Sequence, residues 1–130
     1  MSEQIRIVLV EDNKVFREAL ELLLELRSDV QVVASVGDGT EAVPACIQYQ
    51  PDVVLMDIRL PGMDGVQATA AIKRSCPDVA VVCLTATATG AEIDALFAAG
   101  AVACLLKDQE LEEIVTVIHS AAAGRLARAE

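Results

Sequence analysis

Aromatic residues and positive charges are scarce in this chain of 130 residues. Aromatic side chains make up only 2% of the sequence although hydrophobic residues make up 54%, so Ala, Val, Leu and Ile must fill the core. Such a composition is typical of buried parallel strands with close-packed helices. Ten Lys and Arg stand against twenty Asp and Glu, giving a net charge of −10, and the ten basic residues are scattered. Binding of phosphate backbones needs clustered basic residues, so this balance argues against a nucleic-acid surface on the domain.

Long apolar runs and paired cysteine motifs are also lacking. No stretch approaches the ~20 apolar residues that a membrane span requires, and the polar start Met1-Ser2-Glu3-Gln4 does not resemble a signal peptide. We therefore expect no membrane contact and a reduced, cytoplasmic setting. The cysteines have no C-x-x-C spacing, which predicts small buried hydrophobic residues rather than a disulfide framework or a zinc site. They are Cys46, Cys76, Cys83 and Cys104.

Short apolar runs alternate with longer segments of helical periodicity, five of each. This alternation predicts an α/β fold, a doubly wound five-stranded parallel sheet with five flanking helices. We expect one domain over residues 1–124, with 125–130 as the start of a linker or an artificial end of the chain. The expected strands are 5–10, 32–36, 53–56, 79–84 and 101–106, and the expected helices are 14–26, 39–49, 65–75, 90–98 and 111–123.

Capping residues support these helix boundaries. Three polar residues each stand three positions before a Glu or Gln, the spacing of a capping box, and two glycines follow helical segments as C-terminal caps. The pairs are Asp38 with Glu41, Asp64 with Gln67 and Thr89 with Glu92, and the glycines are Gly100 and Gly124.

Carboxylates stand at the ends of two apolar strands. Asp57 ends a run that is apolar on both faces, and Glu11 and Asp12 end the first strand. In an open parallel sheet all strand ends that carry chemistry lie along one edge. A strand order of 2-1-3-4-5 would place strands one and three side by side, so these three carboxylates would meet. Thr85 and Lys107 end strands four and five at the same edge.

Three neighbouring carboxylates repel one another, by on the order of 4 kcal/mol for each pair at ~4 Å and an effective dielectric of ~20. A divalent cation relieves this repulsion, and an all-oxygen ligand set favours Mg²⁺ over zinc. The Lys107 ammonium and the Thr85 hydroxyl suit a phosphoryl group. An isolated strand-end Asp is more often a helix cap, but the joint occurrence of these groups predicts phosphoryl transfer onto Asp57.

Four segments resemble the receiver domain of two-component response regulators, which has a flavodoxin-like fold. In order and over nearly the whole chain, they are Val8 to Asp12, Pro51 to Gly65, Leu84-Thr85-Ala86 and Leu105-Leu106-Lys107-Asp108. The resemblance implies a signalling switch and not an enzyme of metabolism. Such a switch catalyses only its own phosphorylation and dephosphorylation. A sensor histidine kinase would be the phosphodonor, and Mg²⁺, or Mn²⁺ in its place, the cofactor. The implied site residues are Asp57 as phosphoacceptor, Asp12 as a direct metal ligand, Glu11 as a ligand through water, the Arg59 carbonyl as a third protein ligand, and Thr85 and Lys107 as contacts of the phosphoryl group.

The segment Leu105 to Asp108 and the last helix resemble the LuxR, NarL and FixJ type of regulator, whose receiver precedes a helix-turn-helix output domain. By that resemblance the chain would regulate transcription, contacting DNA only through a domain outside these 130 residues. A stand-alone receiver is the alternative. Self-association as a phosphorylation-dependent homodimer, through the fourth and fifth helices or the last one, is a further expectation.

One position departs from the family pattern. Receivers usually carry Tyr or Phe three residues before the lysine as a rotamer switch, and this chain has Cys104. We therefore expect the signal to depend on Thr85 and the loop 86–88, with phosphorylation itself preserved. Arg59 and Thr87 occupy the positions that in the family tune the lifetime of the phosphoryl group, and a long Arg59 is expected to shield it from water.

Several alternatives compete with this interpretation. Gly37, Gly39 and Ala42 fit the glycine spacing of a dinucleotide site but leave the acidic residues unexplained. A Mg²⁺-dependent phosphohydrolase would place a second Asp two residues after the nucleophile, where Arg59 stands. A degenerate receiver used only for protein contacts is a third possibility, which the intact acidic set disfavours.

The first helix carries two apolar stripes, Phe16-Leu20-Leu23 and Val15-Ala19-Leu22-Leu26. The simpler expectation is one wide buried face. The alternative is that part of the second stripe docks the helical phosphodonor domain of a histidine kinase.

Overall fold

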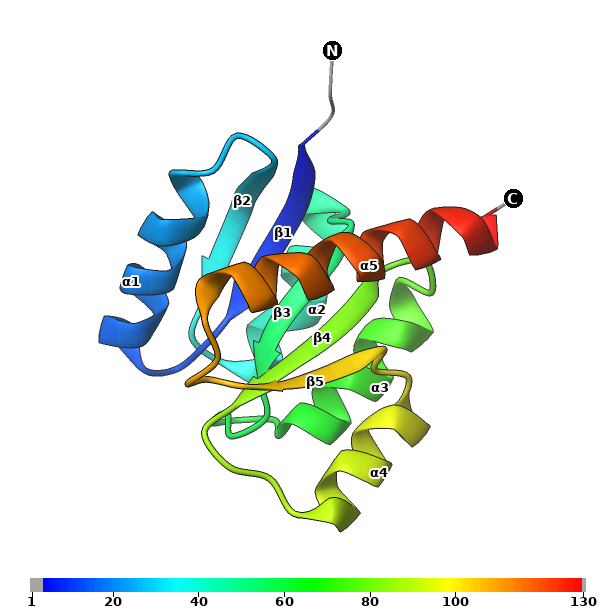
Figure 1. Ribbon diagram of the computed structural model, residues 1–130. Coiled ribbons are helices and arrows are strands. Elements are labelled where there is room, and N and C mark those ends of the chain that lie inside the picture. Colours follow the sequence, from blue (N-terminus) through cyan, green and yellow to red (C-terminus); the bar gives the residue numbers. More distant parts are fainter. Residues whose placement is uncertain (1–3, 130) are drawn as a thin grey trace.

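A five-stranded parallel sheet forms the centre of the protein, seen in a computed structural model that describes residues 4–129, except the side chains of 125–129 (Figure 1). The strand order is β2-β1-β3-β4-β5, which confirms the predicted fold. The strands are β1 (Ile5–Val10), β2 (Val30–Val36), β3 (Val53–Asp57), β4 (Ala80–Thr85) and β5 (Ala103–Leu106). The helices are α1 (Lys14–Glu25), α2 (Gly39–Tyr49), α3 (Gly65–Ser75), α4 (Gly90–Ala99) and α5 (Leu111–Ala129).

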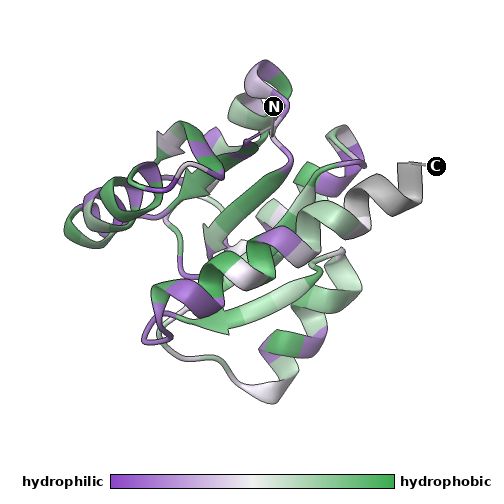
Figure 2. Cartoon of the chain, turned by 45° about the horizontal axis from the view of Figure 1, so that its top comes forward, coloured by the Kyte–Doolittle hydropathy of each residue, from purple (hydrophilic) through white to green (hydrophobic). Residues whose placement is uncertain are grey.

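Helices cover both faces of the sheet. Figure 1 shows α1 and α5 on one face and α2, α3 and α4 on the other. Successive side chains of a strand point to opposite faces of the sheet. The apolar strands therefore contribute side chains to two separate cores, one on each face. Leu9 and Leu55 pack in the core under α1 and α5, and Val8 and Val54 pack under α2, α3 and α4. Figure 2 shows the strands as almost uniformly hydrophobic, whereas the helices carry polar stretches.

The register of the strands sets which residues reach the edge together. Val10 pairs with Met56, Asp57 with Leu84, and Thr85 with Leu106. Each pairing is parallel, so the carboxyl ends of β1, β3, β4 and β5 lie along one edge of the sheet. The topology therefore places the predicted polar residues together at the carboxyl edge of the sheet.

Helix caps agree with the sequence at most positions. The capping boxes of Asp64 with Gln67 and Thr89 with Glu92 are both formed, and Gly100 ends α4 in the left-handed region. The box predicted for Asp38 and Glu41 is wrong. Asp38 does cap α2, but its carboxylate accepts from the amide and hydroxyl of Thr40 instead, because this shorter reach satisfies both groups with one oxygen.

Helix α5 continues past the predicted end at Gly124, to Ala129. The expected C-terminal cap at Gly124 is therefore wrong. Gly124 does not adopt the positive φ of such a cap, and no side chain packs where its Cβ would lie. A helical glycine costs about 1 kcal/mol relative to alanine, which the alanine-rich segment around it tolerates. The predicted division at residues 124 and 125 remains a prediction; residue 130 and the side chains of 125–129 lie outside the described residues.

The face of α1 is narrower than expected. Leu20 and Leu24 are buried, whereas Val15, Leu22 and Leu26 are 81%, 61% and 77% exposed. The prediction of one wide buried face is therefore wrong, because only one side of α1 meets the sheet and α5. The second stripe lies open to solvent.

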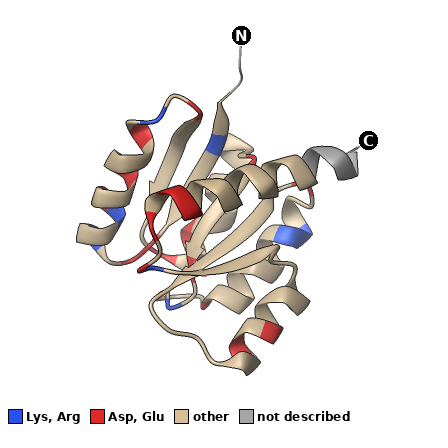
Figure 3. Cartoon of the chain, in the orientation of Figure 1, with Lys and Arg blue, Asp and Glu red and all other residues tan. Residues whose placement is uncertain are grey.

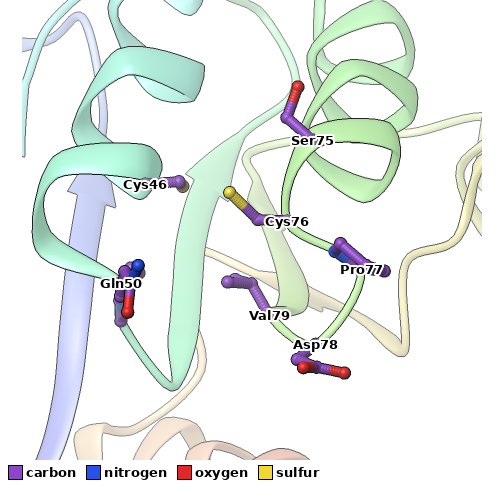
Figure 4. Close-up of a pocket in the computed structure, with 8 residues that line it drawn as sticks. Cys46, Gln50, Ser75, Cys76, Pro77, Asp78 and Val79 are labelled. Atoms are coloured by element: carbon purple, nitrogen blue, oxygen red, sulfur yellow. The ribbon is translucent and has the colours of Figure 1, made fainter.

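The opposite, amino-terminal edge of the sheet contains a small hollow between the ends of α2 and α3. Figure 4 shows the side chain of Cys46 on α2 and that of Cys76, the residue after α3, lining this hollow. Pro51 and Val79, which precede β3 and β4, close its floor. All four cysteines are free thiols. Within residues 4–129, no helix combines the length and apolar character that crossing a bilayer demands.

Candidate functional site

Three carboxylates converge at the carboxyl edge of the sheet, as predicted. One carboxylate oxygen from each of Glu11, Asp12 and Asp57 lies within 4.8 Å of the others. Glu11 and Asp57 are only 2% and 5% exposed, whereas Asp12 is exposed. Asp and Glu occur at many other places along the ribbon and outnumber Lys and Arg (Figure 3). This group differs because two of its members, Glu11 and Asp57, are buried together.

The residues after β1 hold Glu11 in place. Its backbone N–H donates to the Val36 carbonyl of β2 at 3.0 Å, and its side chain accepts from the Asn13 N–H at 2.9 Å. Asn13 in turn caps α1, so the turn that starts the helix also orients the carboxylate. The Arg17 guanidinium donates to the Glu11 carbonyl at 2.6 Å. Burial raises the pKa of Glu11 above its ordinary value despite these hydrogen bonds.

Asp57 is held by its own loop. Its Oδ1 accepts from the Arg59 N–H at 3.0 Å, and its Oδ2 accepts from the Lys107 ammonium at 3.0 Å. The loop folds back tightly at Gly65, whose N–H donates to the Ile58 carbonyl at 3.0 Å. A Cβ on Gly65 would lie 2.4 Å from the Ile58 Cα, so this return requires glycine. The sequence motif after Asp57 thus fixes the mouth of the site.

Lys107 ties the two buried carboxylates together. Its Nζ pairs with both Glu11 and Asp57, and it lies 4.7 Å from the centre of the Phe16 ring, within cation–π range. Burial alone would lower the pKa of this lysine, but the hydrogen bonds to Glu11 and Asp57 outweigh burial and raise it. The Lys107 side chain therefore stays protonated at neutral pH. The contact with Phe16 was not predicted, because Phe16 lies far from Lys107 in the sequence and on a different element.

Thr85 ends β4 beside the acidic group and is fully buried. Its Oγ1 donates to the Thr87 carbonyl at 2.8 Å, and its own carbonyl accepts from the Lys107 N–H at 2.8 Å. The hydroxyl therefore points along the β4–α4 loop. A rotation about χ1 would redirect it, which is what a switch role requires.

The Arg59 side chain extends to helix α4 instead of lying over Asp57. Its guanidinium forms a two-point ion pair with Glu92, at 2.7 and 3.0 Å. This pair holds the pKa of the Glu92 carboxyl down at about 2. Glu92 was predicted only as part of a cap, and nothing in its spacing from Arg59 could have revealed the contact.

Cys104 occupies the predicted switch position on β5. It pairs in register with Cys83 of β4 and is partly buried against the core under α2, α3 and α4. Its thiol is too small for the inward and outward swing of an aromatic ring. The transmission of a signal at this position stays a prediction.

The donor set fits Mg²⁺. Three carboxylates with neighbouring oxygens, one exposed to solvent, match the preference of this ion for oxygen ligands with several retained waters. The Lys107 ammonium neutralises part of the negative charge of Glu11 and Asp57. Its side chain is a flexible four-carbon chain, so the ammonium can shift toward a bound anion. The carbonyl of Arg59 as a ligand remains an expectation.

The glycine pattern at 37–42 has a packing role. A Cβ on Gly39 would lie 2.1 Å from the Met63 carbonyl oxygen. The N–H of Gly39 donates to the Pro61 carbonyl at 3.3 Å. Gly39 therefore seats α2 against the β3–α3 loop, which accounts for this glycine without a dinucleotide.

Comparison with known proteins agrees with this geometry. The family model of the response regulator receiver domain matches residues 7–119. The chain is 35% identical over 120 residues to the transcriptional regulatory protein LiaR of Bacillus subtilis, covering 92% of this chain and 57% of LiaR. It thus spans little more than half the length of such curated relatives.

Solved structures extend the likeness to the fold. The signal receiver domain of NarL from Mycobacterium tuberculosis superposes with a TM-score of 0.89 at 36% identity, covering 94% of this chain and 98% of that one. A two-component response regulator of the LuxR family from Aurantimonas superposes with a TM-score of 0.88 at 33% identity, covering 95% of this chain and 88% of that one.

Proposed function

Because the chain belongs to the response regulator receiver family, we propose that it accepts a phosphoryl group on Asp57 from the phosphohistidine of a sensor kinase. The observation that carries the proposal is the buried pair of carboxylates bridged by one lysine at the sheet edge. Burying these charges is costly, and no structural need at a strand end explains it. A site that must bind and release a phosphoryl group does.

The proposed reaction uses side chains that are already in place. An oxygen of Asp57 attacks phosphorus in line, and the bond from phosphorus to the donor's imidazole nitrogen breaks with its electron pair left on nitrogen. Lys107, now shared between two carboxylates, turns to the phosphoryl oxygens, and Thr85 rotates its hydroxyl from the Thr87 carbonyl to another of them. Mg²⁺, held by Glu11, Asp12, Asp57 and the Arg59 carbonyl, supplies further charge neutralisation when bound.

The same site favours a slow switch over a turnover enzyme. A phosphohydrolase with an aspartyl-phosphate intermediate needs an acid/base two residues after the nucleophile, and Arg59 cannot act as one because it stays protonated. The proposed activities are therefore phosphorylation and its self-catalysed reversal. A shorter phosphoryl half-life in Arg59→Ala is expected if the arginine shields the group from water. An unchanged or longer half-life removes that role.

The open stripe of α1 is the proposed docking surface for the kinase. Val15 and Leu22 are exposed on α1, which starts two residues after Asp12, and Leu26 is exposed at the end of this helix. An apolar helix face beside the phosphoacceptor suits a partner that presents its histidine from a helix.

Output to DNA is proposed to pass through a domain outside the matched region. LiaR and related curated proteins are transcriptional regulatory proteins, and the region matched by this chain covers 57% of the length of LiaR. Phosphorylation is expected to change self-association through α4, α5 or both. Size-exclusion chromatography with and without a phosphoryl mimic tests this; an unchanged elution volume contradicts it.

Intact mass after incubation with acetyl phosphate tests the central proposal. We expect a gain of one phosphoryl group that requires Mg²⁺ and is lost in Asp57→Asn. Asp78→Asn, which removes the same charge at the other edge of the sheet, serves as the matched control and keeps the gain. No gain in the unaltered chain under any condition favours a degenerate receiver that works only through protein contacts.

A further inference from the structure

The side chain two residues after the phosphoacceptor ties the β3–α3 loop to helix α4. The Arg59 Nη1 donates to Glu92 Oε2 at 2.7 Å and Nη2 donates to Oε1 at 3.0 Å. Two parallel hydrogen bonds fix the plane of a guanidinium more firmly than one. The same Nη2 donates to the Thr87 carbonyl at 3.3 Å. One arginine therefore holds both the first turn of α4 and the loop that precedes it.

Glu92 is an anchored partner. Its Oε1 accepts from the Thr89 N–H at 3.0 Å, while its own N–H donates to the Thr89 hydroxyl at 3.1 Å. This capping box sets the start of α4. The ion pair thus attaches Arg59 to a fixed helix end rather than to a freely moving side chain.

The Thr87 carbonyl accepts from two groups that both lie beside Asp57. One donor is the Thr85 hydroxyl at 2.8 Å and the other is Arg59. The Arg59 backbone N–H donates to the Asp57 carboxylate at 3.0 Å. The Arg59 guanidinium and the Thr85 hydroxyl therefore meet at one acceptor in the loop beside the phosphoacceptor.

We propose that the Arg59–Glu92 ion pair is a latch on helix α4, which opens when a phosphoryl group on Asp57 draws the guanidinium away from Glu92. The inference rests on the proposed function, because it needs Asp57 to be phosphorylated. A phosphoryl group carries close to two negative charges at neutral pH, against one on the carboxylate of Glu92. Its oxygens also match the two-point geometry of arginine.

Opening the latch has a defined structural effect. Once Thr85 and Arg59 both turn to the phosphoryl group, the Thr87 carbonyl loses both donors. Glu92 keeps its capping box with Thr89, so α4 stays helical while its tie to the β3–α3 loop is lost. This route from Asp57 to α4 does not pass through position 104, where the chain has a cysteine instead of an aromatic ring.

Amide hydrogen exchange of the full chain with Mg²⁺, before and after acetyl phosphate, tests the latch. We expect exchange in segment 86–93 to rise by about two- to five-fold on phosphorylation, the factor that corresponds to losing an exposed ion pair. In Glu92→Gln the segment should exchange faster from the outset, and phosphorylation should add little. Glu18→Gln removes a charge from the exposed pair with Lys14 on α1 and is the matched control, with unaltered exchange at 86–93.

The lifetime of the phosphoryl group gives a second readout, which a purely structural role of Glu92 would not move in this way. Glu92→Gln frees the guanidinium to stay on the phosphoryl group, so the half-life should lengthen by about two- to five-fold. In an Arg59→Met background the same substitution should have no effect, because the group that Glu92 restrains is gone.

The outcomes separate the latch from the function on which it rests. Additive effects of Arg59→Met and Glu92→Gln on the half-life, or unchanged exchange at 86–93 in a chain that gains full phosphoryl mass, overturn the latch alone. A chain that gains no phosphoryl mass overturns both the latch and the proposed function.

Discussion

The two ends of the β-sheet are built from opposite chemistry. At the carboxyl end, charged groups are buried and bound to one another, with Lys107 between Glu11 and Asp57. At the amino end, two thiols and two prolines surround a small hollow (Figure 4). At the amino end, the ends of α2 and α3 pack together around this hollow. The carboxyl end carries the proposed chemistry.

The two ends differ in the free energy needed to bury their side chains. Burying carboxylates without partners is highly unfavourable, so a folded chain keeps them only where each has a counter-charge. Thiols cost little to bury and need no partner. The carboxyl end therefore depends on the pairing of buried charges, whereas the thiols at the amino end need no such partner.

Removing the counter-charge should produce the largest effect. Lys107→Met leaves Glu11 and Asp57 buried together without a cation, so we expect a loss of about 3 kcal/mol in unfolding free energy at neutral pH. Urea unfolding measures it. Millimolar Mg²⁺ should restore much of the loss, because the ion binds the same carboxylates in the folded state.

The pH dependence of that loss follows from two pKa shifts. The pKa of Lys107 is raised in the folded protein, so its contribution is present below 10.5 and is lost only as pH rises through the folded value. The pKa of Glu11 is raised above 4.5 by burial, so its ionisation destabilises the fold as pH rises. The defect of Lys107→Met should therefore shrink toward acid pH. A defect that grows in acid would contradict the assignment.

At the amino end, the matching change should cost less. Cys46→Ser places a hydroxyl at a fully buried position, and we expect a loss of about 2 kcal/mol by urea unfolding. Cys76→Ser is the paired control, because this side chain is only partly buried and its hydroxyl can reach water; about 0.5 kcal/mol is expected. Neither loss should respond to Mg²⁺, which distinguishes the two ends of the sheet.

Thiol labelling tests burial at the amino end without a mutation. Burial raises the pKa of Cys46 to about 12, so at pH 8 only about one molecule in ten thousand carries its thiolate. Cys76 is more accessible, so iodoacetamide should modify it first. Cys83, whose pKa burial also raises to about 12, should be as protected as Cys46. Equal rates at Cys46 and Cys76 would show that the hollow opens freely.

The smallest effect concerns one partly exposed carboxyl, that of Glu92, at the carboxyl end. Its ion pair with Arg59 holds the pKa of Glu92 at about 2. The stabilising effect of this pair is present above pH 4.5 and is lost as pH falls toward 2. Carbon NMR of the Glu92 carboxyl should give a midpoint near about 2, which moves back toward 4.5 in Arg59→Met. The same midpoint in both proteins would exclude the ion pair in solution.

Most of the fold follows from periodicity. Alternating apolar runs and helical segments predicted the ten elements, because buried parallel strands and amphipathic helices leave distinct patterns. The predictions were wrong where the sequence pattern does not determine the packing of a helix. The open stripe of α1 and the continuation of α5 past Gly124 depend on which neighbours are present, and no spacing along the chain specifies that.

The site divides in the same way. Glu11, Asp12, Asp57, Thr85 and Lys107 were predicted because the topology of a parallel sheet brings strand ends together. Phe16 over Lys107 and Glu92 on Arg59 were not predicted. Both contacts are made by side chains that cross between elements, and only the packed structure reveals them.

By these proposals, the sheet that separates the two cores would also keep the input surface on α1 apart from the output surface on α4. A donor seated on α1, as proposed, would occupy one face, while the latch reaches α4 on the other. The strand ends around Asp57 are where the two layers communicate. A kinase bound to α1 would therefore not cover α4, and substitutions on α1 that suit a new kinase would leave the surface of α4 unaltered. This separation would let one receiver be rewired to a new stimulus by changes on a single helix.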